Sequence, residues 1–109
     1  MRIGESKRQG DVLLTRVATV RRRLSPVAPS LVPGRHVLAL GEATGHHHSV
    51  AAADAELLET EAHEVFLRVM RATPLEHQEH GAVALEPGVY RVTRQVEYSP
   101  KELPRRVMD

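Results

Sequence analysis

The sequence predicts an all-β protein, a small sandwich or barrel of short antiparallel strands. Turn-forming pairs such as Gly10-Asp11 and Pro87-Gly88 interrupt the chain at short intervals. Between the turns lie short segments rich in Val and Leu, and this pattern is typical of sandwiches and barrels. The 109 residues suffice for one hydrophobic core without metal or disulfide support. We therefore expect a single domain over residues 1–109.

Three segments are predicted as strands. The first two are DVLLTRV, residues 11–17, and RHVLALGE, residues 35–42. The connection LSPVAPSLVPG between them, residues 24–34, is rich in proline, which lacks an N–H and is excluded from central strands and helix interiors. The third segment is VYRVTRQVEY, residues 89–98. Its two-residue period puts apolar side chains and one charge, Arg94, on one face and polar side chains on the other.

Residues 50–72, VAAADAELLETEAHEVFLRVMRA, fit two structures. Their apolar residues follow a helical stripe, and Ala and Glu favour a helix. The same stretch divides into strands AELLET and EVFLRVM around a turn at residues 61–63. The absence of Gly or Asn from that turn counts against the hairpin. We expect two strands, because VFLRVM is rich in residues that favour β structure, and the helix is the alternative.

Composition excludes several classes of protein. Cys is absent, so disulfides, thiolate metal ligands and a cysteine nucleophile are excluded. A net charge of +1 argues against a chain covered in basic charge. An aromatic content of 3% is too low for rows of rings that stack on nucleic-acid bases. No apolar run could span a membrane, and the N-terminus lacks the apolar core of a signal peptide, so we expect no membrane partner and a cytoplasmic location.

Two short stretches contain most of the seven histidines: GHHHSV at residues 45–50 and LEHQEHG at residues 75–81. Residues two apart on an extended strand project from the same face, so His46 and His48 would point the same way. Imidazole nitrogen with carboxylate oxygen is a ligand set for zinc, iron, manganese or nickel. We predict a site for a divalent metal ion, with the candidate ligands His46, His48, His77 and His80. The isolated His36 and His63 are expected to be ordinary surface or core histidines.

The histidines also fit other functions. Two imidazoles with pKa values near neutrality can act as base and acid on a phosphodiester, with Arg91 and Arg94 neutralising the phosphate. RNA or a small molecule is then the partner, and exposed strand edges favour a homodimer. A non-enzymatic binding module is the third hypothesis. At a metal site, Glu79 would be a ligand or a base that acts on metal-bound water. For metal-assisted and metal-free reactions taken together, the candidate catalytic residues are Glu79, His80, Tyr90 and Arg94.

Two geometric predictions follow. Arg94 lies on an apolar face, and an unpaired buried guanidinium is costly, so we expect it to meet a carboxylate or to project into a polar pocket. The candidate carboxylates are Glu42, Glu79 and Glu97. The alternative is an edge-strand arginine that lies along the surface. We also expect the two histidine stretches to lie on neighbouring strands and share one pocket, with Tyr90 or Gln95 on its wall.

Residues 41–92 resemble the metal-binding motifs of cupins. GHHHSVAAADAELLE supplies His46-x-His48 with Glu56 after it, and GAVALEPGVY matches the Gly and Pro of the second motif. Tyr90 stands near the position of that motif's ligand histidine. The resemblance implies metal-ligand roles for His46 and His48. Most of the chain is also similar to small uncharacterised bacterial proteins that share QGDVLL, GEATGHHH, HQEHG and GVYRVTRQVEYSP, which implies a compact β fold.

Overall fold

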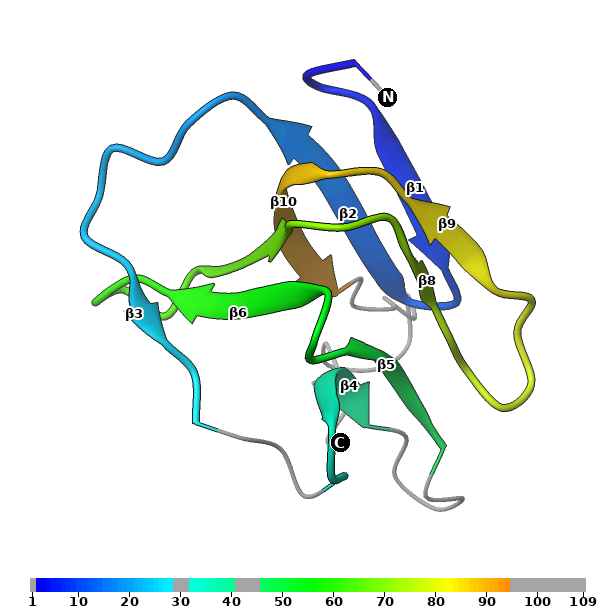
Figure 1. The fold of residues 1–109 in the computed structure, drawn as a ribbon. Coiled ribbons are helices and arrows are strands. Elements are labelled where there is room, and N and C mark those ends of the chain that lie inside the picture. The colour runs from blue at the N-terminus through cyan, green and yellow to red at the C-terminus, as the bar shows by residue number, and fades with distance from the viewer. Residues whose placement is uncertain (1, 29–31, 41–45, 95–109) are drawn as a thin grey trace, which may run out of the picture.

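The computed structural model describes residues 2–28, 32–40 and 46–94, which form strands, turns and loops without any helix (Figure 1). The all-β prediction is confirmed. The strands in chain order are β1 (Ser6–Gln9), β2 (Val12–Val17), β3 (Ser25–Pro26), β4 (Arg35–Leu40), β5 (His47–Ala51), β6 (Ala55–Glu59), β7 (Val65–Val69), β8 (Thr73–Leu75), β9 (Val83–Leu85) and β10 (Gly88–Arg94). Within the described ranges, no helix is long and apolar enough to cross a membrane.

Six strands form one antiparallel sheet in the order β1-β2-β10-β7-β6-β3. The other four form the hairpins β4-β5 and β8-β9. A single antiparallel bridge between Ser49 and Glu76 joins the two hairpins. The N–H of each residue donates to the carbonyl of the other at 2.9 Å. The bridge therefore sets β5 beside β8.

The hydrophobic core lies between the six-stranded sheet and the two hairpins. Alternate residues of the sheet face inward, so Tyr90 of β10 is fully buried and its partner across the ladder, Leu67 of β7, is also buried. The hairpins contribute Val50, Leu75 and Leu85 to the same cluster. Apart from Tyr90, the buried members of this cluster are aliphatic, as the low aromatic content of the chain requires.

Residues 50–72 form strands and turns, so the helical alternative for this stretch is wrong. β6 and β7 pair over all five residues of each strand. The turn between them lacks Gly, but His63 takes a left-handed φ of 62°, a conformation in which His is several-fold enriched among non-glycine residues. Thr60 closes the turn: its N–H donates to the Glu64 carbonyl at 2.9 Å, and its hydroxyl accepts from the Glu64 N–H at 3.2 Å.

The three strands predicted at 11–17, 35–42 and 89–98 correspond to β2, β4 and β10. Residues 41, 42 and 95–98 lie outside the described part of the chain. The turn at Gly10-Asp11 connects β1 to β2. It points toward the loop between β8 and β9, and this junction carries the histidine site.

Candidate functional site

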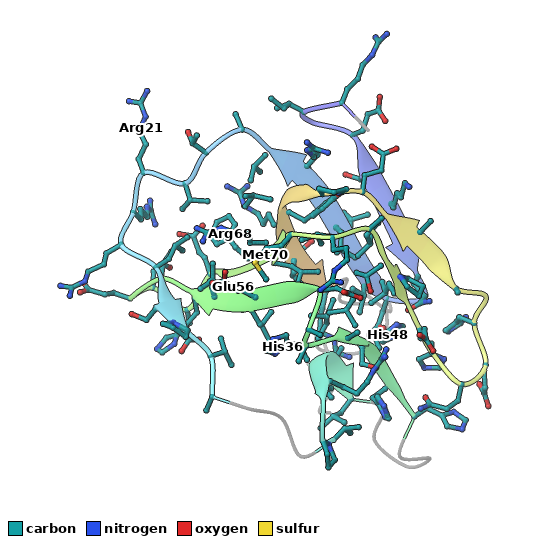
Figure 2. The ribbon with its side chains drawn as sticks, viewed as in Figure 1. Arg21, His36, His48, Glu56, Arg68 and Met70 are labelled. Carbon is teal, nitrogen blue, oxygen red and sulfur yellow. The ribbon has the colours of Figure 1, made fainter. Side chains whose placement is uncertain are left out.

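The backbone brings the two histidine stretches together through the pairing of β5 with β8. The first stretch enters β5, and the second follows β8 in the loop to β9. Because Ser49 and Glu76 pair directly, the residues just before Ser49 lie next to those just after Glu76. Figure 2 shows His48 on β5, on the side toward β8.

Four imidazole rings form a cluster at this junction. The ring centroids of His48 and His77 are 4.4 Å apart, and those of His77 and His80 are 4.5 Å apart. His46 lies 5.6 Å from His77 in an edge-to-face contact, and His48 stacks on His80 at 5.9 Å with an interplanar angle of 13°. The predicted proximity of the two stretches is confirmed.

Gly10 forms the floor of this cluster. Its φ is +58°, a left-handed conformation that suits glycine. A Cβ atom at this position would lie 2.8 Å from His80 Nε2 and 3.2 Å from His48 Cε1. The turn between β1 and β2 thus approaches the rings closely, and a larger residue at position 10 would require the His80 ring to move.

His48 is 5% exposed, and its neighbours fix its tautomer. The side-chain nitrogen of Gln9 donates to the carbonyls of Leu75 and Gly81, both at 2.9 Å, so its oxygen Oε1 is left as an acceptor. That oxygen lies 2.9 Å from His48 Nδ1. Nδ1 must therefore donate, and in the neutral ring the lone pair belongs to Nε2.

The Nε2 lone pair of His48 faces Asp11, whose Oδ1 is 3.4 Å away. Burial first, and then the charge of His77, lowers the pKa of His48 to about 4, so the ring is neutral at pH 7. Burial of Asp11 acts to raise its pKa, but the hydrogen bond and charge of Arg94 outweigh it and leave that pKa below its usual value. At neutral pH, a carboxylate and an imidazole lone pair thus face the same small space.

Arg94 donates to Asp11 through Nη2 at a distance of 2.6 Å from Oδ2. The expectation that Arg94 has a carboxylate partner is confirmed, but Asp11 was not among the predicted partners. Of those, Glu42 and Glu97 lie outside the described residues. Glu79 instead places Oε1 3.3 Å from Nδ1 of His46. Arg94 comes within reach of Asp11 because its Cα pairs with that of Val12, the next residue along the chain.

His77 organises its own loop. Its Nδ1 accepts hydrogen bonds from the backbone N–H groups of Glu79 at 3.0 Å and His80 at 3.2 Å. The neutral ring therefore carries its proton on Nε2. Burial, together with the charges of His80 and His46, lowers the pKa of His77, so this arrangement persists at pH 7. His77 presents an N–H to the cluster rather than a lone pair.

Tyr90 does not line the histidine cluster, contrary to our expectation for the pocket wall. Its side chain is fully buried, and its hydroxyl donates to the carbonyl of Glu86 at 2.5 Å. Burial raises the pKa of this hydroxyl. The other candidate for the wall, Gln95, lies outside the described residues. Arg91 projects from the opposite face of β10, since it alternates with the buried Tyr90 and Val92.

A pocket of about 310 Å³ adjoins the cluster and shares His77 with it. Its polar lining residues are Arg35, His47, Ser49, Glu76, His77 and Gln78. Gln78 Oε1 accepts from the His47 N–H at 2.8 Å, and Arg35 donates to the Ser49 carbonyl at 3.0 Å. The pocket is large enough to admit a few non-hydrogen atoms of a polar ligand beside the rings.

In the described ranges, no group of three or more His, Asp or Glu side chains is already arranged around a common ion position. The cluster instead offers two close pairs of a ring nitrogen and a carboxylate oxygen: His46 Nδ1 with Glu79 Oε1 at 3.3 Å, and His48 Nε2 with Asp11 Oδ1 at 3.4 Å. Only the second pair is largely buried and has its imidazole tautomer fixed by a hydrogen bond. Sequence reasoning missed Asp11 and Gln9, since QGD was interpreted only as a turn and a strand start. The feature of the sequence that could have indicated them is a pair of polar residues, Gln9 and Asp11, on either side of a glycine in a predicted turn.

The fold and the site define a small all-β domain with a histidine cluster above the β1–β2 turn. The chain belongs to a family described as a domain of unknown function (DUF8820), whose model matches residues 8–95. That range contains every described residue of the cluster, from Gln9 to Arg94. No curated protein and no solved structure matches the chain significantly. The expected membership of an uncharacterised family agrees with this finding, whereas the cupin resemblance stays a prediction.

Proposed function

We propose that this protein binds a divalent metal ion at the histidine cluster, with His48 Nε2 and Asp11 Oδ1 as the first two ligands. The observation that carries the proposal is their separation of 3.4 Å. Two ligand atoms at about 2.1 Å from one ion, at a tetrahedral angle, lie about 3.4 Å apart. A shared cation would also relieve the repulsion between a carboxylate and the imidazole lone pair that faces it.

The residues that hydrogen-bond to these two ligands, Gln9 and Arg94, also support a metal site. Metal-binding imidazoles usually donate their other N–H to an acceptor, which fixes the ring and its tautomer, and Gln9 accepts from His48 in this way. Arg94 binds the second oxygen of Asp11 and keeps the carboxylate ionised. Both ligands are thus held in the state that an ion requires.

Further ligands would come from the exposed part of the cluster. His80 is exposed and His46 is half-buried, so both rings have room to turn toward an ion beside His48. Glu79 lies next to His46 and supplies a further carboxylate, either as a ligand or as a base. His77 fits the role of a hydrogen-bond donor better than that of a ligand, because its Nδ1 lone pair serves two backbone N–H groups.

Metal-assisted hydrolysis is the reaction class that such a site would serve, with the adjoining pocket of about 310 Å³ receiving a small polar substrate. Metal-free acid–base cleavage of RNA is the weaker candidate. A pKa of about 4 makes His48 a poor base at pH 7. Arg94, which this mechanism needs to neutralise the phosphate, instead donates a hydrogen bond to Asp11.

The test measures zinc, manganese and nickel binding to protein prepared without a polyhistidine tag, by calorimetry and by elemental analysis. We expect one bound ion per chain, and at least about 10-fold weaker binding in His48→Ala and Asp11→Asn. His63→Ala is the matched control, since His63 is an exposed histidine in the β6–β7 turn, and it should bind as the wild type does. Absence of stoichiometric binding, or equal affinity in all four proteins, would contradict the proposal.

A further inference from the structure

The outer face of the six-stranded sheet carries a separate group of charged side chains. On this face Arg91 of β10 lies opposite Phe66 of β7. Arg68 lies two residues further along β7, opposite Glu56 of β6, and Figure 2 shows Arg68 and Glu56 side by side. Arg8 of β1 is exposed on the same face, opposite Leu13 of β2.

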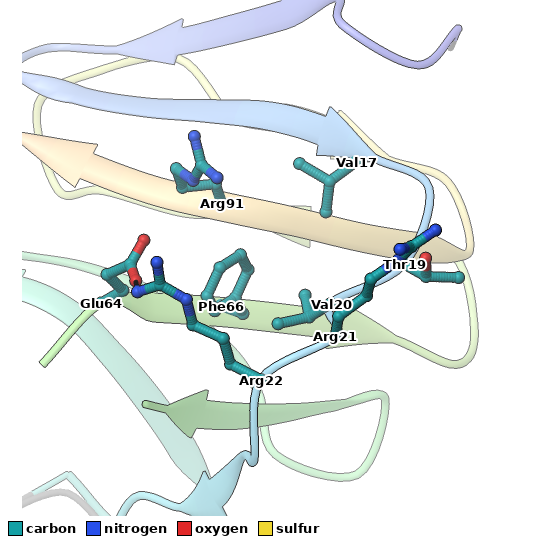
Figure 3. A pocket seen from close by; sticks show the side chains of 8 residues that line it. All are labelled: Val17, Thr19, Val20, Arg21, Arg22, Glu64, Phe66 and Arg91. Carbon is teal, nitrogen blue, oxygen red and sulfur yellow. Dashed lines mark hydrogen bonds and ion pairs between the residues drawn. The ribbon is translucent and has the colours of Figure 1, made fainter. Parts of the chain in front are cut away.

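A pocket of about 200 Å³ opens on this face where the chain leaves β2 (Figure 3). Arg21, Arg22 and Arg91 line it, with Phe66 at its base. The guanidinium carbon of Arg91 lies 5.8 Å from the centre of the Phe66 ring, a cation–π contact that holds the Arg91 side chain in place. Arg22 forms an ion pair with Glu64 at the rim.

Positive charge is concentrated on this face. The pocket and the strand register place on it five arginines (Arg8, Arg21, Arg22, Arg68 and Arg91) and two glutamates (Glu56 and Glu64), a net charge of +3. The whole chain has a net charge of only +1. Three of the five arginines line the pocket, and Arg8 on β1 and Arg68 on β7 extend the charge beyond it. The face therefore matches a ligand with repeated negative charges better than a single small anion.

We propose that this outer face binds the phosphodiester backbone of a nucleic acid. Guanidinium groups match phosphate oxygens in a two-pronged geometry, and Arg91 is already oriented by Phe66. The aromatic ring itself is only 3% exposed, so it cannot stack on a base. Contacts to phosphates without stacking or base-edge contacts position a nucleic acid but carry no sequence information. Binding is therefore independent of sequence and sensitive to salt.

The test follows fluorescence anisotropy of labelled 20-nucleotide single-stranded RNA, single-stranded DNA and duplex DNA, at 50 and 200 mM NaCl. EDTA is present, so the outcome does not depend on the metal site. For three phosphates contacted on a single strand, the logarithm of the affinity should fall by about 2 for each tenfold rise in salt. Arg91→Gln should weaken binding several-fold and reduce this slope by about 0.7–1.

Arg71→Gln is the charge-matched control, because Arg71 lies in the β7–β8 connection, pairs with Asp54 and is not one of the five arginines. It should bind as the wild type does, and circular dichroism checks the fold of each variant. Equal loss of binding in both variants would overturn the proposal. So would binding of polyglutamate, or of vesicles with anionic headgroups, as tight as that of the nucleic acids.

Discussion

The histidine cluster and the outer arginine face differ in how their charges are compensated. In the cluster, Asp11 lies between the guanidinium of Arg94 and the ring of His48, and buried Gln9 satisfies the other side of that ring. On the outer face, arginines outnumber glutamates, and Arg68 and Arg91 are exposed. One region is closed by hydrogen bonds, whereas the other leaves positive charge facing solvent.

This difference predicts different kinds of recognition. The His48–Asp11 pair is held by hydrogen bonds from Gln9 and Arg94 and so has a fixed geometry. It should discriminate between metal ions by size and coordination and depend strongly on each residue of the pair. Exposed like charges act together through their combined potential, and their contributions are roughly independent and screened by salt. Single substitutions should therefore cost stability in the cluster and affect only binding on the outer face.

The largest expected effect is that of Gln9→Leu. Gln9 is 3% exposed, and its loss leaves His48 Nδ1 and the carbonyl of Leu75 without their partner in the core. A buried polar group without a partner costs about 1–3 kcal/mol, so we expect the free energy of unfolding in urea to fall by about 3 kcal/mol.

Gln78→Leu is the matched control for this experiment. Gln78 is an exposed glutamine that also bonds a histidine, through the His47 N–H at 2.8 Å. Water can replace it, so the unfolding free energy should change by less than about 1 kcal/mol. Similar losses in the two variants would show that burial of the Gln9 network does not stabilise the fold.

The strands could be predicted where the sequence itself carries the periodicity. Alternation over VYRVTRQVEY places Tyr90 and Val92 inward and Arg91 outward, as observed. The stretch at 50–72 was ambiguous because its apolar spacing fits both periods and its turn lacks glycine. The structure resolves it through His63, whose left-handed φ is a property of one residue that no hydrophobic pattern encodes.

The site was predictable only in part. The clustering of histidines along the chain, and the expectation of short strands, sufficed to predict that the two stretches meet. The expected strand placement is wrong for the second stretch, because His77 and His80 lie in the β8–β9 loop. The partners Gln9 and Asp11 could not be found in this way, because His48 reaches Gln9 across 39 positions of sequence. Their contact depends on how the β1–β2 turn packs under the β8–β9 loop. Arg94 was paired with the wrong carboxylates for the same reason.

The pH dependence of stability tests the buried state of His48. Its pKa falls from an ordinary value of 6.5 to about 4 in the folded protein. Between these two values the unfolded chain binds a proton that the folded chain does not, so stability is full above about pH 6.5 and falls as the pH is lowered toward 4. Chemical denaturation at a series of pH values measures this slope.

His48→Asn provides the comparison for the pH experiment. It should lose stability at pH 7 but show a smaller decrease between pH 6.5 and 4 than the wild type, because one of the groups that take up protons on unfolding is gone. If His48→Asn keeps the wild-type dependence of the unfolding free energy on pH, His48 has the same pKa in the folded and unfolded states, which contradicts the prediction.

The smallest expected effect is that of Arg68→Gln on the outer face. Arg68 and Glu56 form an ion pair at 3.8 Å with both side chains nearly half exposed, and such pairs contribute little because solvent screens them. The unfolding free energy should change by less than about 0.5 kcal/mol, while nucleic-acid binding weakens.

The same substitution at Arg94 removes a 2.6 Å hydrogen bond to the half-buried Asp11, and we expect the unfolding free energy to fall by about 1–2 kcal/mol. Equal losses of unfolding free energy in the two variants would contradict the predicted difference between the partly buried cluster and the exposed outer face.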